Sequence, residues 1–361
     1  MPTRCVHCHG GMRCFSRPAK PNDTQVITSH RMHATAQAQP NIALVKYWGK
    51  RDAALNLPAA GSLSITLDAL HTRTRVRFDD SLGADDVTLN GEHEEAHTRK
   101  IGAFLDLFRA RAGIATRARV ESGNDFPTGA GLASSASGFA ALAVAAGRAL
   151  GLELATRELS VLARRGSGSA ARSIHGGFVE MAPGTRTDGE DAFATRVLEA
   201  RAWPLKVVVA VTSRKKKAVD SRAGMEASQR TSPYYRDWIA AVPRDLDAAR
   251  HAVQTRDFEK LARVSEASCL AMHAVMLATR PALIYWNGAT LDCIQCIRSL
   301  QAEGTGVFFT IDAGPQVKAV CLDDGTARVT EALRGVPGVE DVLVSGLGEG
   351  ARIVEDADAC A

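Results

Sequence analysis

The sequence predicts an α+β fold, and three patterns support this prediction. Apolar and polar residues alternate over 62–70 and again over 72–80, with a turn between them, as in antiparallel strands. Residues 92–113 instead repeat apolar side chains with a helical period and end in a glycine. Strand and helix patterns then follow one another without the strict alternation that builds a doubly wound sheet. We therefore expect a mixed arrangement of helices and sheets.

The other elements follow from local patterns in chain order. A strand and a turn are expected at 116–127, and an alanine-rich helix begins near Ser134. Thr156 is expected to cap a helix that ends near Gly166. Further strands are expected at 176–184, 205–213 and 306–314, and further helices across 220–278 and at 289–302. The strand at 205–213 is β-branched and of the buried type, so we expect it to begin the second half of the chain.

Composition excludes several classes of protein. The 361-residue chain is 45% hydrophobic with a formal charge of +4, enough for one large domain or two closely packed ones. Lysine and arginine are not concentrated over any long element, which argues against nucleic-acid binding. No apolar segment is long enough to span a bilayer and the N-terminus lacks a hydrophobic signal region, so we expect a cytoplasmic protein without membrane attachment. Eight cysteines in so long a chain indicate reduced thiols.

Three segments stand apart from this background. The basic run at 214–217 is either a solvated loop or a site that attracts a small anion. Cys293 and Cys296 are spaced to share one face of a helix. Residues 1–33 contain side chains of types that bind zinc, but no second spaced pair: Cys5, His7, Cys8, His9 and Cys14. We assign no metal ligands and expect a disordered leader, or a start codon placed too early with Met32 as the true start.

The stretch FPTGAGLASSASGFAALAVAAG, residues 126–147, has two interpretations. Gly129 and Gly131 permit close approach of the backbone to a ligand, and Ser134 and Ser135 lie where the first helical turn begins. Free N–H groups and the helix dipole favour phosphate at such a position. The alternative is a glycine-containing turn before a core helix, and the residues alone do not decide between the two. No lysine follows Gly131, so the common G-x-x-x-x-G-K-[ST] phosphate loop is excluded.

Three further positions carry charged side chains in unusual settings. Asp312 ends an apolar strand before a Gly-Pro turn, where it either bonds its own backbone or orients and deprotonates a hydroxyl. Arg172 follows two glycines and either makes a surface salt bridge or binds a carboxylate or phosphate with its fork. The segment VKYWGK, with Lys46 and Lys50, is either a strand with exposed lysines or part of an anion site.

Several of these segments resemble known motifs. PTGAGLASSA resembles the P-x-x-x-G-L-x-S-S-A loop of the GHMP kinase superfamily. NIALVKYWGKRD, LNLPAAGSLSITL, NDFPTGAGLASSAS, RRGSGSAARSIHGGFVE, KKAVDSRAGM and FFTIDAGPQVK, in that order, resemble mevalonate diphosphate decarboxylases, and the resemblance runs from about residue 34 to 354. These motifs are long and unusual, so the resemblance is specific.

The resemblance implies a fold and a reaction. The fold is the GHMP kinase fold, with a ribosomal-protein-S5-like half at 34–204 and a ferredoxin-like half at 205–361 around a deep cleft, in a homodimer. The reaction is the ATP- and Mg²⁺-dependent phosphorylation of the tertiary 3-hydroxyl of mevalonate 5-diphosphate. Loss of phosphate and carbon dioxide then yields isopentenyl diphosphate. Two alternatives remain open: a decarboxylase of mevalonate 5-phosphate, and a mevalonate 3-kinase that does not decarboxylate.

The resemblance also implies roles for individual residues. Asp312 corresponds to the catalytic aspartate, Arg172 to the arginine on the substrate carboxylate, and Lys46 to a lysine of the same site. Substrate-binding residues are Tyr47, Lys50, Ser167, Gly168, Ser169, Arg222, Met225 and Ala313. Nucleotide-binding residues are Ser122, Gly129, Ala130, Gly131, Leu132, Ala133, Ser134, Ser135 and Ser221. The chain departs from the family pattern at Gly129 and Ala171, which are small-for-small changes, and at Ala60 and Gly61, where polar residues are expected.

Overall fold

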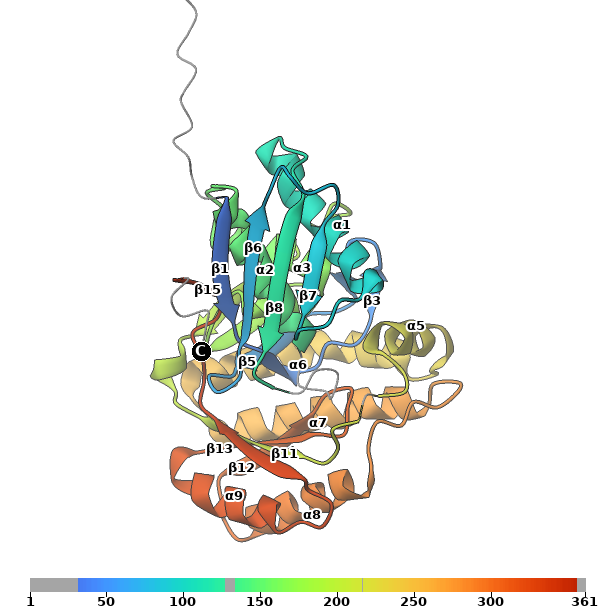
Figure 1. The fold of residues 1–361 in the computed structure, drawn as a ribbon. Coiled ribbons are helices and arrows are strands. Elements are labelled where there is room, and N and C mark those ends of the chain that lie inside the picture. The colour runs from blue at the N-terminus through green and yellow to red at the C-terminus, as the bar shows by residue number, and fades with distance from the viewer. Residues whose placement is uncertain (1–31, 127–133, 216, 356–361) are drawn as a thin grey trace, which may run out of the picture. The chain divides into compact units, whose positions relative to one another are not determined.

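The computed structural model describes residues 32–126, 134–215 and 217–355, and the predicted α+β class is confirmed in them (Figure 1). The described residues form three larger sheets and one two-stranded hairpin. Two of the larger sheets are built mainly from the N-terminal half, residues 32–204, and the third from the C-terminal half, residues 205–355.

The first sheet has five strands in the order β15-β1-β6-β8-β7. Their bounds are Arg352–Val354, His33–Ala38, Thr72–Phe78, Ala118–Asn124 and Asp86–Leu89. β7 and β8 are parallel, and the other pairs are antiparallel. Because β15 pairs with β1, the end of the described chain returns to the N-terminal sheet.

The second sheet has four antiparallel strands in the order β10-β9-β5-β2. Their bounds are Ala194–Leu198, Phe178–Met181, Ser62–Thr66 and Asn41–Val45, and a small hairpin joins β3, Lys50–Asp52, to β4, Leu57–Pro58. The prediction that 62–70 pairs with 72–80 is wrong, because β5 and β6 lie in different sheets. β5 is buried along its whole length because the hydroxyls of its alternating Ser and Thr residues find partners inside the protein.

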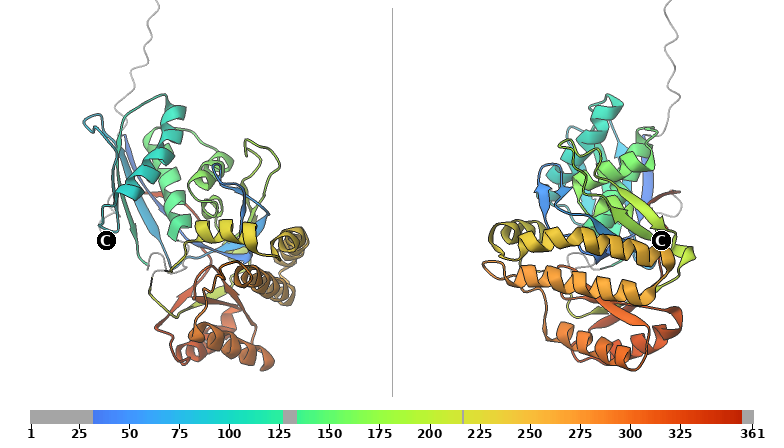
Figure 2. Two further views of the ribbon diagram at one scale, coloured as in Figure 1. Left: turned by 90° about the vertical axis from the view of Figure 1, so that its right-hand side faces the viewer. Right: turned by 180° about the vertical axis from the view of Figure 1, so that it is seen from behind.

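Helices α1, Glu95–Ala112, α2, Ser134–Ala149, α3, Thr156–Gly166, and α4, Ala170–Ser173, belong to the N-terminal half (Figure 2). The alanines of α2 let it pack closely on β1 and β6. α3 and α4 connect α2 to the second sheet. The predicted cap at Thr156 is wrong by one position: Ala155 is the N-cap, and its N–H donates to the Glu158 carboxylate at 2.9 Å.

The third sheet has the antiparallel order β12-β13-β11-β14, with bounds Val307–Ile311, Val317–Cys321, Lys206–Val211 and Asp341–Ser345. Side chains of β11 alternate between two hydrophobic clusters, so both faces of this sheet are covered. Helices α5, Ser221–Thr231, α6, Tyr235–Thr255, and α7, Phe258–Leu277, belong to the side that faces the N-terminal half. Helices α8, Gly288–Ala302, and α9, Thr326–Arg334, cover the other face. Short 3₁₀ helices occupy Ala200–Ala202 and Asp323–Gly325.

α6 and α7 lie between the second and third sheets. α6 contacts β2, β5 and β10, while α7 contacts both β2 and β12. The ends of β2 and β12 therefore meet at α7. Among the described residues, no helix is both long and apolar enough to cross a membrane.

Candidate active site

An aspartate and a lysine from opposite halves of the chain meet where β2 and β12 end. Lys46 directly follows β2, Asp312 directly follows β12, and Lys46 Nζ lies 2.7 Å from Asp312 Oδ1. Hydrogen bonds fix both strand ends: Thr310 Oγ1 donates to the Ala43 carbonyl at 3.2 Å, and Lys46 N–H donates to Ser268 Oγ of α7 at 3.0 Å. Lys46 is 1% exposed and lies outside any strand, so the alternative of a strand with exposed lysines is excluded for this residue.

A second lysine contacts the same carboxylate. Lys318 Nζ lies 3.4 Å from Asp312 Oδ2, and its side chain is fully buried on β13. Burial by itself would raise the pKa of Asp312, but the two lysines outweigh it and hold that pKa at about 2. The aspartate is therefore ionised throughout the physiological range, and it does not serve as a turn residue that bonds its own backbone through its side chain. Sequence reasoning assigned no role to Lys318, although a lysine inside the apolar run VKAVC was an available signal.

Arg172 is buried without an acidic partner among the described residues. Its Nη1 donates to Ser62 Oγ at 2.6 Å and its Nε to Asn41 Oδ1 at 3.1 Å, while its Nη2 has no partner in the same residues. Burial lowers the pKa of Arg172 to about 10, which still leaves the guanidinium charged at neutral pH. The surface salt bridge considered from sequence is excluded. A buried cation with neutral partners and a free amino group is suited to an incoming carboxylate.

Tyr47 lies between Arg172 and residues 167–169, which we call the serine-glycine loop and which are predicted to bind the substrate. Its ring lies 5.9 Å from the Arg172 guanidinium, and its buried hydroxyl has no hydrogen-bond partner among the described residues. Burial raises the pKa of Tyr47 to about 12. A side chain at Gly168 would place its Cβ only 2.3 Å from this hydroxyl, so the absence of a side chain there lets the two segments meet. Tyr47 and Gly168 thus lie together, as the predicted substrate site requires.

The same loop reaches the start of the alanine-rich helix. Ser167 Oγ lies 3.3 Å from both Ser135 Oγ and Ser169 Oγ. Ser135 is in the first turn of α2, where unpaired N–H groups attract anions. Ser134 also lies in this turn, and its carbonyl accepts from Ser137. The predicted phosphate-binding residues 129–133 lie outside the described residues. The hydroxyl of Ser122, which is a predicted nucleotide-binding residue, lies 2.8 Å from the Thr74 hydroxyl.

A cluster of cations forms beside this region. Lys50 Nζ donates to Asn56 Oδ1 at 2.6 Å, and Asn56 Nδ2 donates in turn to the Arg165 carbonyl at 2.7 Å. Burial and, to a smaller extent, the nearby Arg222 together lower the pKa of Lys50 to about 8. Burial, followed by Arg222, also lowers the pKa of Lys100 on α1, so the three cations lie within electrostatic reach of one another. Among the described residues, neither Arg222 nor Lys100 makes an ion pair. Such a cluster favours a multiply charged anion.

The lowered pKa of Lys50 predicts a pH dependence. Lys50 is a cation below about pH 8 and becomes neutral above it, so attraction for a substrate anion is present at lower pH and lost as the pH rises. From pH 7 to 9 we expect the KM for the anionic substrate to rise up to about tenfold. In Lys50→Arg, which stays charged, the KM should not show this rise. The measurement is KM against pH for both proteins, and an identical rise in the two would contradict the assignment.

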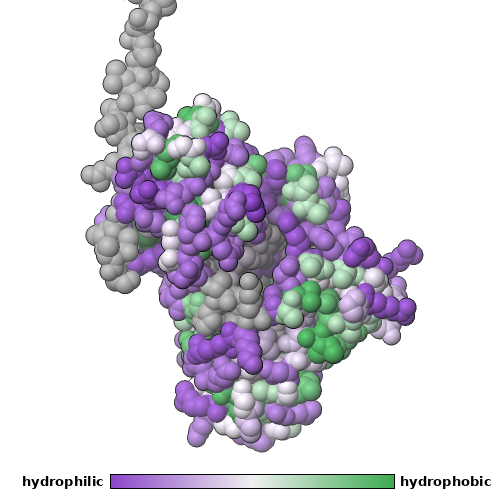
Figure 3. Space-filling model, turned by 45° about the vertical axis from the view of Figure 1, so that its right-hand side comes forward, coloured by the Kyte–Doolittle hydropathy of each residue, from purple (hydrophilic) through white to green (hydrophobic). Residues whose placement is uncertain are grey.

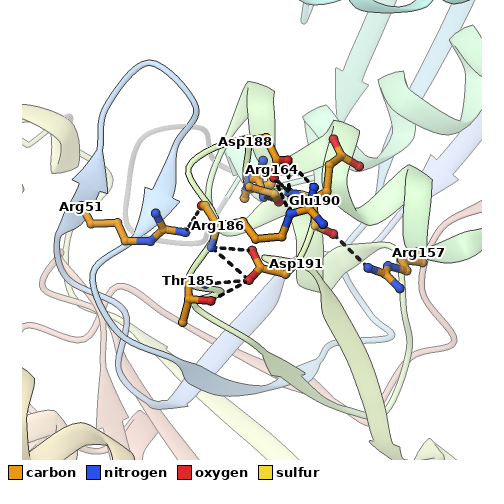
Figure 4. A network of polar contacts seen from close by, with 9 residues as sticks. Arg51, Arg157, Arg164, Thr185, Arg186, Asp188, Glu190 and Asp191 are labelled. Atoms are coloured by element: carbon orange, nitrogen blue, oxygen red, sulfur yellow. Dashed lines mark hydrogen bonds and ion pairs between the residues drawn. The ribbon is translucent and has the colours of Figure 1, made fainter.

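Arginines hold the hairpin that carries Lys50 (Figure 4). Buried Arg164 donates from Nη1 to the Gly189 and Ala192 carbonyls, both at 2.6 Å, and from Nε to the Leu55 carbonyl at 3.2 Å. Arg51 Nη2 donates to the Arg186 carbonyl at 3.0 Å. The turn between β3 and β4 is therefore attached both to α3 and to the loop at 183–193. This attachment keeps Lys50 next to the serine-glycine loop that follows α3.

Helix α5 brings further predicted residues to the site. Asp220 caps the helix by accepting from the backbone N–H groups of Arg222 and Ala223. Lys217 Nζ donates to Ser221 Oγ at 2.7 Å and to the Ala313 carbonyl at 3.1 Å, which ties α5 to the residue after Asp312. Burial lowers the pKa of Lys217. The anion-attracting interpretation of the basic run therefore suits Lys217, whereas Arg214 pairs with Asp341 at 2.8 Å.

The uncharged positions singled out in the sequence include Met225, Gly61, Cys293 and Cys296. Met225 is buried in the main hydrophobic cluster, and Gly61 leaves space for Leu246, whose Cδ2 would lie 2.6 Å from a Cβ there. Cys293 and Cys296 are free thiols on α8. Within the described part of the chain, no three His, Cys, Asp or Glu side chains gather as a metal site. The cysteines and histidines that raised the possibility of zinc binding, Cys5, His7, Cys8, His9 and Cys14, lie outside that part.

Comparison with known proteins places these features in one family. Residues 38–194 match the family model of the diphosphomevalonate decarboxylase-like N-terminal domain, and residues 207–345 match that of the mevalonate 5-diphosphate decarboxylase C-terminal domain. The diphosphomevalonate decarboxylase of Candida albicans is 39% identical over 297 residues, which cover 78% of this chain and 82% of the relative.

Solved structures agree with the family models. A mevalonate diphosphate decarboxylase from Enterococcus faecalis, described for its mevalonate diphosphate-mediated ATP binding, is 39% identical, with a TM-score of 0.82 over 90% of this chain and 99% of the other. MDDEF in complex with MVAPP, AMPPCP and magnesium is 40% identical, with a TM-score of 0.83 and the same coverage. The architecture predicted from the resemblance is thereby confirmed, and the chain belongs to the diphosphomevalonate decarboxylase family.

Proposed function

We propose that this protein catalyses the ATP-dependent decarboxylation of mevalonate 5-diphosphate to isopentenyl diphosphate, with release of ADP, phosphate and carbon dioxide. The observation that carries the proposal is the arrangement of Asp312, Lys46 and Arg172. One site offers an ionised carboxylate for a hydroxyl and a buried guanidinium for a carboxylate, and the substrate possesses both groups. Membership of the family supports the same reaction.

Asp312 orients the 3-hydroxyl and accepts its proton while the hydroxyl oxygen attacks the γ-phosphoryl group of ATP and ADP leaves. A carboxylate with a pKa of about 2 is a weak base, so positioning and electrostatics supply most of the rate enhancement. Phosphate then leaves with the C–O electron pair, and the electrons of the C–C bond to the carboxylate form the alkene. Arg172 orients the carboxylate until carbon dioxide departs, and Lys46 offsets the charge that develops at the reacting oxygen.

The remaining substrate groups have complementary partners. The substrate is bound by Tyr47, Lys50 and Arg222. The serine-glycine loop, Ser167, Gly168 and Ser169, also binds it, as do Met225 and Ala313. The cation cluster of Lys50, Lys100 and Arg222 supports the diphosphate in preference to a less charged tail.

The nucleotide binds at the start of α2. Its phosphates are held by Gly129, Ala130, Gly131, Leu132, Ala133, Ser134 and Ser135, with Ser122 and Ser221 beside it. Helix α5 and the segment before it close over the phosphates and exclude water from the transfer. Magnesium, bound together with ATP, would neutralise negative charge on the phosphates.

The test is a panel of mevalonate, its 5-phosphate and its 5-diphosphate with Mg-ATP, in which ADP, phosphate and carbon dioxide are measured together. We expect all three products in equal amounts with the 5-diphosphate. Decarboxylation of the 5-phosphate with at least equal kcat/KM would favour the monophosphate alternative. ADP without carbon dioxide would favour the 3-kinase and contradict the proposal.

We further propose that the two halves, 34–204 and 205–361, act as one domain each and that the protein is a cytoplasmic homodimer. The free thiols of Cys269, Cys293, Cys296 and Cys321 suit a reducing compartment. Figure 3 shows a hydrophobic area on one face, and exposed Leu277 and Ile284 are of the kind found in interfaces. Sedimentation velocity should give twice the 38.4 kDa chain mass, and a monomer at micromolar concentration would contradict the dimer.

A further inference from the structure

Lys318 lies in a β-strand of the C-terminal half, whereas Lys46 lies outside any strand. β13 is an internal strand of the third sheet, and Lys318 pairs in register with Thr310 of β12. Residues paired across two strands share one face of the sheet, so Lys318 lies on the face of Thr310, and Asp312, directly after β12, contacts it there at 3.4 Å. The sheet therefore fixes the backbone position from which the Lys318 side chain reaches Asp312. Lys46, in contrast, lies in the segment between β2 and β3.

Each of the two lysines contacts a different oxygen of the Asp312 carboxylate. Lys46 Nζ contacts Oδ1 at 2.7 Å, and Lys318 Nζ lies 3.4 Å from Oδ2. In the absence of substrate, both oxygens are thus engaged by cations. A carboxylate oxygen accepts a hydroxyl proton more readily once no cation contacts it. If Lys46 turns to the substrate, Oδ1 becomes free while Oδ2 keeps its counter-ion.

We propose that Lys318 is a positioning residue that holds Oδ2 of Asp312 and keeps the carboxylate ionised when Lys46 leaves Oδ1 for the substrate. This inference rests on the proposed function. The proton of the substrate hydroxyl then passes to Oδ1 as the hydroxyl oxygen forms its bond to the γ-phosphoryl group, and ADP leaves with the electron pair of the broken P–O bond. The proton afterwards passes to solvent. Lys318 touches neither the hydroxyl nor the phosphoryl group and acts through Asp312 alone.

The groups around Asp312 agree with this assignment. Lys217, on the segment before α5, and Arg172, on α4, both lie within electrostatic reach of Asp312. On α7, Cys269 and His273 also face this region, and burial keeps both of them neutral by raising the thiol pKa and lowering that of the imidazole to about 3. Burial of Asp312 opposes its ionisation, and Lys46 and Lys318 are the groups that offset this effect most strongly. When Lys46 moves away, Lys318 therefore has the largest remaining influence.

The experiment compares Lys318→Met with wild type and with Lys206→Met. Lys206 is a matched control because it lies on the neighbouring strand β11 and pairs with Asp323, remote from Asp312 in its contacts. For Lys318→Met we expect kcat to fall about 10- to 100-fold while KM for each substrate stays within about threefold. We also expect the acid limb of kcat to move to higher pH than in wild type, because the pKa of Asp312 rises once its fixed counter-ion is removed. Lys206→Met should match wild type in all three readouts.

Two kinetic outcomes would overturn the inference: a Lys318→Met enzyme with wild-type kcat and pH profile, or one in which KM alone changes. Should Lys318→Met fail to fold, Lys318→Gln carries the same test with a neutral side chain of similar length. A readout independent of turnover is the ¹³C NMR titration of the aspartate carboxyls, with Asp312 assigned from the signal lost in Asp312→Asn. An unchanged Asp312 pKa in Lys318→Met contradicts the inference, whereas absence of turnover in wild type contradicts the proposed function instead.

Discussion

Asp312→Asn is expected to lower kcat by at least about a thousandfold, because an amide cannot accept the hydroxyl proton that the carboxylate takes up. The carboxylate is ionised well below neutral pH, with a pKa of about 2, so wild type is fully competent at pH 7. The substitution leaves Lys46 and Lys318 facing a neutral group. Removing one partner from a buried ion cluster costs several kcal/mol, so the thermal midpoint should fall as well.

The loss of activity must therefore be separated from the loss of stability. Nucleotide binding to Asp312→Asn should stay within about threefold of wild type at 25 °C, below its unfolding transition, because the predicted phosphate loop does not include Asp312. Single-turnover measurement with Mg-ATP and substrate then reports the chemical step directly. A variant that is folded, binds nucleotide and turns over at more than about a tenth of the wild-type rate would exclude Asp312 as the base.

The sequence drew attention to residues that stand in unusual motifs, but not to a residue placed by the register of strands. Asp312, Arg172 and Lys46 each lie in a short segment whose composition is odd for a strand or loop, and the structure gives all three buried polar partners. Lys318 lies in an apolar strand, and only its pairing with Thr310 places it beside the aspartate. Strand pairing depends on the fold as a whole, so it cannot be read from a short segment of the sequence.

The wrong pairing of 62–70 with 72–80 has a related cause. Alternation of apolar and polar residues predicts a strand with one face in water, but the polar face of β5 is buried. Ser62 accepts from Arg172, and Thr66 donates to the His175 carbonyl, so these hydroxyls are satisfied inside the protein. A polar residue with an internal partner cannot be told from a solvated one by its position in the sequence. The same ambiguity left Arg172 open between a surface salt bridge and a ligand site.

Arg172→Met is expected to lower kcat/KM by about a thousandfold while leaving thermal stability unchanged or higher. Burial lowers the pKa of Arg172 from 12.5 to about 10, so the folded protein disfavours its charge by about 3 kcal/mol. Removing the charge therefore stabilises the folded protein. The loss of the hydrogen bonds to Ser62 and Asn41 reduces this gain in stability by about 1 kcal/mol each. The pKa is lowered on folding, so the destabilising charge is present below about pH 10 and disappears above it. At pH 7 it is fully present.

The buried charge of Arg172 serves substrate binding. A carboxylate that enters the site can bind this desolvated cation, whose Nη2 has no partner among the described residues. Arg172→Lys tests the geometry: it keeps the charge but lacks the fork, so its kcat/KM should lie between wild type and Arg172→Met. Differential scanning calorimetry and product analysis measure the two effects together. A fall in the thermal midpoint of more than a few degrees in Arg172→Met, with kcat/KM near wild type, would mean that the guanidinium serves the fold and that the substrate carboxylate binds elsewhere.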